Sequence, residues 1–353
     1  MAAGVSITAE EVCKCAITSW YKDFRDVTIT SKFIPLTDAF TKYLLGDGGD
    51  VGLVLPKECS LANVIGDSDS TDSSVSWDDD DDDGIEPPSF PNTVEAIMMA
   101  ITELGGAVFP KLNWSSPRDA TWVAIGNTLR CTCPSDVILL LKSSDFVMHD
   151  LSRVGEYCGL DQTLVPPGGF SLCLRRWVPI NPSGEFRCFV KDSQLIGVSQ
   201  RDTSGCYPHL LSIKDQLMTE VVHFFSSNLL KKFLVKSFVF DVYRRGQADY
   251  QLIDINPFGD MTDPLLFSWS ELCKLSLDQE LPIVRLVEHA FHTIQPSDLI
   301  GCRLPKECSQ LVNGDDDYVE KFVELCKSAR DDIIAQHEKI DNTTPNNTTA
   351  DTQ

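Results

Sequence analysis

Apolar residues recur at every second position in two stretches of the second half of the chain, Phe238–Tyr243 and Tyr250–Asn256. A polar segment that contains Gly246 separates them. Period-two alternation predicts strands, and the short glycine-containing connection predicts that these strands form an antiparallel hairpin. Glu185–Asp202 has the same pattern and predicts a second hairpin, and Ser171–Trp177 predicts a further strand.

Helical periodicity is typical of other segments. Apolar residues three to four positions apart predict helices at Val94–Leu104, Val137–Lys142, Leu210–Leu234 with a break near Ser226–Asn228, and Tyr318–Ile340. Gly105 and Gly106 mark the end of the first of these helices. The KSSDF sequence that begins at Lys142 predicts a loop.

The N-terminal region begins with a helical pattern from Ile7 and continues into a predicted strand at Thr28–Pro35. Trp20, Tyr21 and Phe24 follow helical spacing, so they share one face of this region. This spacing favours packing in the core. The alternative is a surface on which a partner docks.

Composition sets limits on the class of protein. The chain has 353 residues with 42% hydrophobic content, enough for one large domain or two ordinary ones. Lysine and arginine number 30 against 52 acids, for a net charge of −22, which argues against direct nucleic-acid binding and against anionic membranes. The N-terminus lacks the pattern of a signal peptide, and no segment has the length of a spanning helix. Thirteen cysteines then predict reduced thiols and a cytoplasmic location.

Two segments have the composition of disordered chain. Residues 63–91 are rich in Asp, Ser and Pro and contain six consecutive acids, Asp78–Asp83. Such a segment buries too little apolar surface to offset its ordering entropy, so an acidic disordered insertion is predicted. Residues 341–353 predict a disordered tail.

The hairpin formed by Phe238–Tyr243 and Tyr250–Asn256 carries the candidate metal site. Side chains alternate between the faces of a strand, so Asp254 and Asn256 lie on one face, and Asp241 can join them across the hairpin. Carboxylate and amide oxygens are the ligands that Mg²⁺ prefers while it also binds phosphate. The alternative is a hairpin with solvated acids on its outer face.

Cations at two places are suited to phosphate groups. Lys111 precedes a Ser-Pro-Arg turn, which would place one cation and several hydrogen-bond donors together. Arg187, Lys191 and Arg201 belong to the hairpin just upstream of the acids. We interpret these groups as a site that balances phosphate and metal charge. Ordinary exposed cations are the alternative.

Four blocks of sequence resemble the cell division cycle protein 123 family, also called D123: FPKLNWSSPRDATW, LLKSSDF, RRWVPINPSGEFRCFVKDSQLIGVSQRD, and FVFDVY with LIDINPFGDMTDPLLFSW. They cover most of residues 107–270. The resemblance implies an α+β, ATP-grasp-like fold in which two subdomains sandwich a nucleotide. It divides the chain into an N-terminal segment (1–62), the insertion (63–91), a smaller subdomain (92–177), a larger subdomain (178–300), a C-terminal helical segment (301–340) and the tail (341–353).

The resemblance also implies roles for individual residues. Asp241, Asp254 and Asn256 are similar to the metal ligands, Lys111 to the phosphate-binding lysine, and Arg187 and Arg201 to phosphate-side cations. A nucleotide-covering loop is implied at Trp114, Ser116, Pro117 and Arg118. A strand beside adenine is implied at Leu174, Arg175, Arg176 and Trp177.

For function, the resemblance implies a monomeric ATP- and Mg²⁺-binding chaperone that binds the gamma subunit of eukaryotic translation initiation factor 2. It would promote assembly of the heterotrimer and so support translation initiation and cell-cycle progression. Two alternatives are an active ATP-grasp ligase or kinase, and an acidic scaffold that needs no nucleotide. No catalytic residue is assigned, because no stretch has the pattern of an acceptor-substrate site and Asp254-Ile255-Asn256 stands where ligases carry Glu-x-Asn.

Overall fold

The computed structural model describes residues 6–46, 54–59, 87–275 and 282–289. The chain divides into two units, 1–295 and 296–353, and every described residue belongs to the first. The predicted helix at Tyr318–Ile340, the tail and most of the acidic insertion therefore lie outside the described residues. Within the described ranges, no helix combines the length and the apolar character that a bilayer crossing requires.

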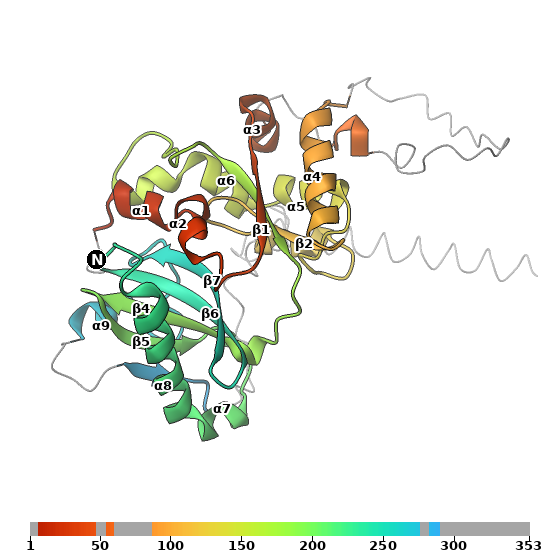
Figure 1. Cartoon of the computed structure of the whole chain (residues 1–353). Helices are drawn as coiled ribbons and strands as arrows, with labels where there is room; N and C mark the ends of the chain where they lie inside the picture. Colours follow the sequence, from red (N-terminus) through yellow and green to blue (C-terminus); the bar gives the residue numbers. More distant parts are fainter. Residues whose placement is uncertain (1–5, 47–53, 60–86, 276–281, 290–353) are drawn as a thin grey trace, which may run out of the picture. The chain divides into compact units, whose positions relative to one another are not determined.

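The described chain is a mixture of helices and strands (Figure 1). The helices are α1 (Ala9–Cys15), α2 (Ile17–Phe24), α3 (Asp38–Leu45), α4 (Pro91–Glu103), α5 (Pro134–Lys142), α6 (Asp145–Ser152), α7 (Pro208–Ser212), α8 (Lys214–Phe224) and α9 (Trp269–Lys274). The strands are β1 (Ser31–Pro35), β2 (Val108–Lys111), β3 (Ser171–Arg176), β4 (Glu185–Lys191), β5 (Gln194–Gln200), β6 (Phe238–Gly246), β7 (Asp249–Pro257) and β8 (Ile283–Arg285). The α+β fold class is confirmed.

The first sheet has three antiparallel strands in the order β1-β3-β2. Helices α3, α4, α5 and α6 share a hydrophobic core with it, and Figure 1 shows α4 and α5 beside β2. Val94, Ile97 and Ile101 recur at helical spacing in α4 and are buried in that core, so amphipathic periodicity determines which face of the helix packs. This sheet carries Lys111 at the end of β2.

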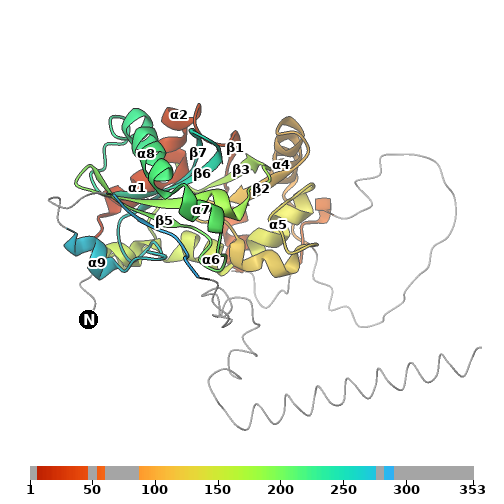
Figure 2. The same ribbon diagram turned by 90° about the horizontal axis from the view of Figure 1, so that it is seen from below.

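The second sheet has five strands in the order β7-β6-β4-β5-β8, and both of its faces are covered. Phe238 and Phe240 face a core shared with α1, α2 and α8, whereas Phe189 and Val239 face a smaller core with α9. Figure 2 shows α8 on one side of this sheet and α9 on the other. Both predicted hairpins are confirmed, as β4–β5 and β6–β7.

Hydrogen bonds join the two described flanks of the insertion. The Lys57 amide donates to the Pro88 carbonyl at 3.0 Å, and the Phe90 amide donates to the Glu58 carboxylate at 3.1 Å. The Phe90 ring packs edge-on against Phe40 at 5.0 Å between centroids. The folded core therefore already includes residues at the predicted C-terminal edge of the insertion.

Some local predictions were wrong. The KSSDF segment is not a loop, because Ser144 caps α6 by accepting a hydrogen bond from the Val147 amide. The predicted Leu210–Leu234 helix is divided at Ile213, and its predicted break near Ser226 is a π-helical turn at Phe225–Leu229. Trp20 and Phe24 are buried, so these side chains pack in the core as expected.

Candidate functional site

The three-stranded sheet and the N-terminal segment meet the five-stranded sheet along three consecutive residues of β7. The Thr28 hydroxyl donates to the Leu252 carbonyl at 2.7 Å. Arg175 of β3 donates through Nη1 to the Ile253 carbonyl at 2.6 Å, and Lys111 of β2 pairs with Asp254. We call residues 252–254 and these partners the seam.

Asp254 lies at the end of the seam and is only partly satisfied. The Lys111 ammonium, 3% exposed, donates to Asp254 Oδ2 at 2.8 Å and also to the Trp114 carbonyl. Asp254 Oδ1 and Asn256 Nδ2 are buried and have no hydrogen-bonding partner among the residues that the structure describes. Buried polar atoms without partners cost free energy, so two of them two residues apart on one strand indicate a place that a ligand satisfies.

Asp241 of β6 lies directly opposite Asp254 in the hairpin register. Its two carboxylate oxygens accept hydrogen bonds from Arg187 Nε and Nη2, each at 2.8 Å, and Arg201 Nε lies 3.6 Å from Oδ2. Burial acts to raise the pKa of Asp241, but the charge and hydrogen bonds of Arg187, together with the charges of Arg201 and Arg118, hold this pKa below its usual value.

Positive charge is in excess around Asp241. Burial and the charge of Arg187 lower the pKa of Arg201 to about 10. Arg118 is exposed to solvent beside this cluster, and the charge of Arg187 disfavours its own charge. Three guanidinium groups lie near two carboxylates, Asp241 and Glu185, so a bound anion would offset the remaining positive charge.

Glu185, at the start of β4, belongs to the same cluster and was not among the predicted residues. Burial raises its pKa, although the charge of Arg201 acts in the opposite direction. Glu185 and Arg187 are two positions apart and therefore share a face of the strand. That period-two relation is the signal by which the sequence could have identified it.

A magnesium ion fits the Asp254 side of the site better than the Asp241 side. The unpartnered Asp254 Oδ1 is a hard oxygen ligand, and the Asn256 amide, whose Nδ2 lacks an acceptor, also carries a side-chain oxygen. Both oxygens of Asp241 already accept from Arg187. Within the described ranges, no three His, Cys, Asp or Glu side chains gather as a complete metal site. Magnesium commonly binds through one or two carboxylates together with substrate phosphates. The metal roles of Asp241, Asp254 and Asn256 remain predictions.

Several predicted cofactor-binding side chains lie in the core. Trp114 is buried and donates from Nε1 to the Val12 carbonyl at 2.8 Å, and Pro117 is also buried. Leu174 is buried in the core of the three-stranded sheet. Arg175 is 1% exposed, and its guanidinium lies 5.5 Å from the centroid of the Phe109 ring. Of these four side chains, Arg175 reaches the seam, and the predicted contacts of all four with a nucleotide are untested.

The other predicted residues of these two segments are more accessible. Ser116 is half-buried in the turn, and Arg176 is exposed at the end of β3. Trp177 is half-buried, with its ring edge-on to Phe109 at 6.5 Å between centroids. The predicted contacts of these residues with a nucleotide are untested.

The structure does not bring Lys191 together with the arginine cluster. Its ammonium donates to the Cys273 carbonyl at 2.6 Å, beside the C-terminus of α9. It lies four positions from Arg187 along β4, which corresponds to about 13 Å in a strand. Lys191 thus interacts with the carbonyls that end α9, as cations near helix C-termini commonly do.

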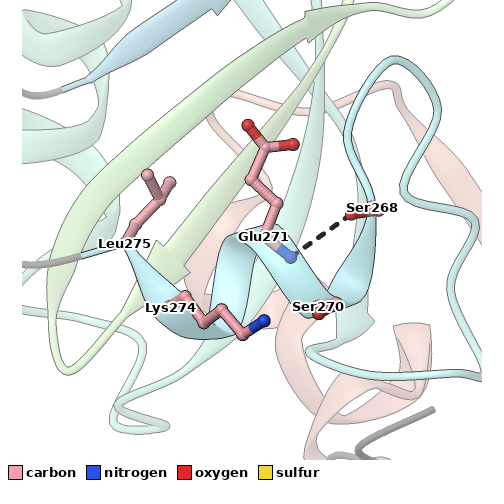
Figure 3. Close-up of a pocket in the computed structure, with 5 residues that line it drawn as sticks. All are labelled: Ser268, Ser270, Glu271, Lys274 and Leu275. Carbon is pink, nitrogen blue, oxygen red and sulfur yellow. Dashed lines mark hydrogen bonds between the residues drawn. The ribbon is translucent and has the colours of Figure 1, made fainter.

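A pocket of about 410 Å³ lies elsewhere, on α9 (Figure 3). Its lining residues are Ser268, Ser270, Glu271, Lys274 and Leu275. The Ser268 hydroxyl accepts a hydrogen bond from the Glu271 amide, and the Glu271 carboxylate pairs with Arg285 of β8. These groups stabilise α9 and its contact with β8, so we do not assign the candidate site to this pocket.

Known proteins resemble this chain over most of its length. The D123 family model matches residues 20–312. A relative from Xenopus tropicalis, "Translation initiation factor eIF2 assembly protein", is 40% identical over 333 residues, which are 92% of this chain and 97% of the relative. "Cell division cycle protein 123" from Phaeosphaeria nodorum is 42% identical over 274 residues, 74% of this chain and 70% of the relative. The solved structure of Cdc123 from Schizosaccharomyces pombe has a TM-score of 0.64 and 37% identity, and the match covers 80% of this chain and 99% of that one. The chain therefore belongs to the D123 family.

Proposed function

We propose that this protein binds ATP with Mg²⁺ at the seam and promotes the assembly of translation initiation factor 2 by binding its gamma subunit. The observation that carries the nucleotide part is the pair of buried, unpartnered atoms, Asp254 Oδ1 and Asn256 Nδ2, beside an excess of cations. Phosphate oxygens and a divalent cation together supply both kinds of missing partner.

In this proposal, cationic residues bind the phosphates and residues with side-chain oxygens bind the metal ion. Lys111, Arg118 and Arg201 bind the phosphates, and Asp254 and Asn256 hold the magnesium ion. Bound magnesium neutralises phosphate charge next to the protein's own acids. Asp241 orients Arg187 through two hydrogen bonds, so its main contribution is to fix the guanidinium that faces the phosphates.

Nucleotide binding would couple the two sheets. Lys111 belongs to the three-stranded sheet, whereas Asp254 and Arg187 belong to the five-stranded sheet. A ligand bound by both favours the arrangement in which both can reach it, by its differential affinity for that arrangement. ATP thus acts as a ligand that stabilises a partner-binding conformation.

The assembly part rests on family membership. Relatives from Xenopus tropicalis and Danio rerio are both named as assembly proteins of this initiation factor, at 40% and 38% identity. The gamma subunit as the direct partner comes from the resemblance of the sequence blocks to this family. The net charge of −22 supports an electrostatic contribution, so binding should weaken as salt increases.

Calorimetry tests the nucleotide part. Wild-type protein should bind ATP more tightly with Mg²⁺ than without it, and Asp254→Asn should lose that Mg²⁺-dependent gain. The matched control is Glu220→Gln, which changes a carboxylate that hydrogen-bonds Arg244 and Tyr250 elsewhere on the same hairpin. Mg²⁺-dependent ATP affinity that is equal in wild type and Asp254→Asn would contradict the metal assignment.

Pull-down with the isolated gamma subunit tests the assembly part. Wild-type protein should retain the subunit at low salt with Mg·ATP, and Asp254→Asn should retain less at the same nucleotide concentration. A gamma subunit that never binds would refute the chaperone function. Turnover of ATP with formation of an amide or phosphoryl product would support the ligase or kinase alternative.

A further inference from the structure

A buried carboxylate outside the phosphate and metal groups holds the turn that carries Lys111. Asp150 is fully buried near the C-terminal end of α6. Its Oδ2 accepts hydrogen bonds from the Ser115 amide at 2.7 Å and the Trp114 amide at 3.2 Å, and its Oδ1 accepts from the Ser115 hydroxyl at 2.7 Å. All three donors belong to one turn.

That turn also binds the lysine. The Leu112 amide donates to the Ser115 carbonyl at 2.8 Å, which closes the turn, and the Lys111 ammonium donates to the Trp114 carbonyl. The Trp114–Ser115 peptide therefore contacts both residues. Its N–H donates to Asp150, and its carbonyl accepts from the Lys111 ammonium. Because the ammonium continues to Asp254, a displacement of the Trp114 peptide would move the lysine at the seam.

We infer that Asp150 is a positioning residue for nucleotide binding, which fixes the Trp114–Ser115 turn and through it the Lys111 ammonium. This inference rests on the proposed nucleotide site. Among the described residues, the hydrogen bonds to the Asp150 carboxylate come from Trp114 and Ser115. None comes from the arginines on the phosphate side or from the proposed metal ligands.

The energetic cost of Asp150 supports a role beyond packing. Burial raises the pKa of Asp150 to about 6, although the Ser115 hydrogen bonds and the charge of Lys111 act in the opposite direction. Burying a carboxylate costs desolvation free energy, which an apolar residue in the same space would not incur. The hydrogen bonds by which Asp150 holds the turn offset this cost. Supporting groups around binding residues commonly have this character.

A second anchor limits how far the turn can move. The Asn113 carbonyl accepts from the Ile17 amide at 2.8 Å, and its side-chain oxygen accepts from the Ser171 amide at 2.9 Å. Loss of Asp150 should therefore loosen the turn without releasing it. We expect Asp150→Ala to weaken ATP binding about tenfold, the lower end of what loss of a supporting group causes.

An isosteric variant separates hydrogen bonding from charge. In Asp150→Asn the side-chain oxygen can accept from both backbone amides while the new NH₂ group donates to the Ser115 hydroxyl. Asp150→Asn should therefore restore affinity to within about twofold of wild type. Val147→Ala is the matched control, since Val147 is buried in the same helix and its apolar side chain offers the turn no hydrogen bond.

A double-mutant cycle with Lys111 provides the decisive readout. Affinity for ATP is measured by calorimetry for wild type, Lys111→Met, Asp150→Ala and the double variant. If Asp150 acts through Lys111, Asp150→Ala should lower the ATP affinity about tenfold in the wild-type background. In the Lys111→Met background, the same substitution should lower the ATP affinity by less than about twofold. Equal weakening in both backgrounds, or an Asp150→Ala variant with wild-type affinity, would overturn the inference.

Hydrogen exchange of the nucleotide-free protein gives an independent measurement. The Trp114 and Ser115 amides should exchange faster in Asp150→Ala than in wild type or Val147→Ala, because they lose their acceptor. Unchanged exchange would overturn the inference. Wild-type protein that binds no ATP would instead overturn the proposed function, whatever the exchange result.

If Asp150→Ala fails to fold, Ser115→Ala replaces it. This variant removes one of the three hydrogen bonds to Asp150, so we expect an ATP affinity about threefold lower than that of wild type.

Discussion

Two ion networks lie on the β6–β7 hairpin and balance their charges differently. Near its turn, Glu220 of α8 accepts hydrogen bonds from Arg244, Tyr250 and Gln216, one cation for one acid. Burial acts to raise the pKa of Glu220, but these bonds lower it to about 2. Farther from the turn, Asp241 is bonded to Arg187 and faces two further arginines.

The difference shows which feature distinguishes a binding site from a structural ion pair. The Glu220 network satisfies its carboxylate with protein groups alone. The Asp241 network has surplus guanidinium charge, and Asp254 and Asn256 beside it have buried atoms that no described residue satisfies. Unmet hydrogen-bonding capacity and charge imbalance, rather than the number of ion pairs, therefore identify the site.

Removal of Arg187 should have the largest effect on stability. Arg187→Ala leaves the Asp241 carboxylate buried without its bidentate partner, and breaking a buried pair in this way costs about 3–5 kcal/mol. Urea denaturation of the wild type and the variant measures the loss. Arg245→Ala is the control, since Arg245 pairs with Asp249 at the surface. A loss as small as that of the control would show that the Asp241 network does not contribute to the fold.

Glu220→Gln should weaken the fold without changing the site. We expect a loss of about 1.5–3 kcal/mol, because hydrogen bonds to a charged group are removed, with ATP affinity unchanged. The pKa of Glu220 is depressed in the folded state, so this stabilisation is present above pH 4.5 and is lost as pH falls towards about 2. The unfolding free energy of wild type and variant should therefore converge in acid. Reduced ATP affinity in Glu220→Gln would contradict the distinction between the networks.

Arg201→Ala should show the opposite behaviour. Loss of this phosphate-side cation should weaken ATP binding about tenfold, or about 1.4 kcal/mol. Stability should be unchanged or slightly higher, since burial and the neighbouring Arg187 charge both disfavour a charged Arg201. Calorimetry and urea denaturation on the same preparation measure both effects. Unaltered ATP affinity would remove Arg201 from the site.

Lys191→Met should have the smallest effect. Its ammonium bonds to the Cys273 carbonyl, so we expect at most about 1 kcal/mol of lost stability. ATP affinity should remain within about twofold of wild type, because the lysine lies about 13 Å from Arg187 along the strand. A large loss of ATP affinity would restore Lys191 to the predicted phosphate site and contradict the arrangement described above.

Strand patterns predicted a substantial part of the site. Period-two alternation was enough to pair β6 with β7 and to place Asp241 opposite Asp254. The same reasoning could not distinguish the two acids, because the positions of Arg187 and Lys111 depend on contacts between residues 54 and 143 positions apart in the chain. Trp114 and Arg175 lie in sequence blocks that resemble the family, and the burial of their polar groups likewise depends on partners from other segments.

The sequence by itself determined the two hairpins, the buried faces of α2 and α4 and the presence of acids and cations suited to Mg²⁺ and phosphate. These features follow from local periodicity and side-chain chemistry, which a single chain displays directly. Only the tertiary structure decided which groups are already satisfied: Asp241 by Arg187, Lys191 by α9, and Asp254 by one oxygen alone. The physical reason is that desolvation and hydrogen-bond partners depend on long-range packing, whereas residue type fixes only the capacity to bond.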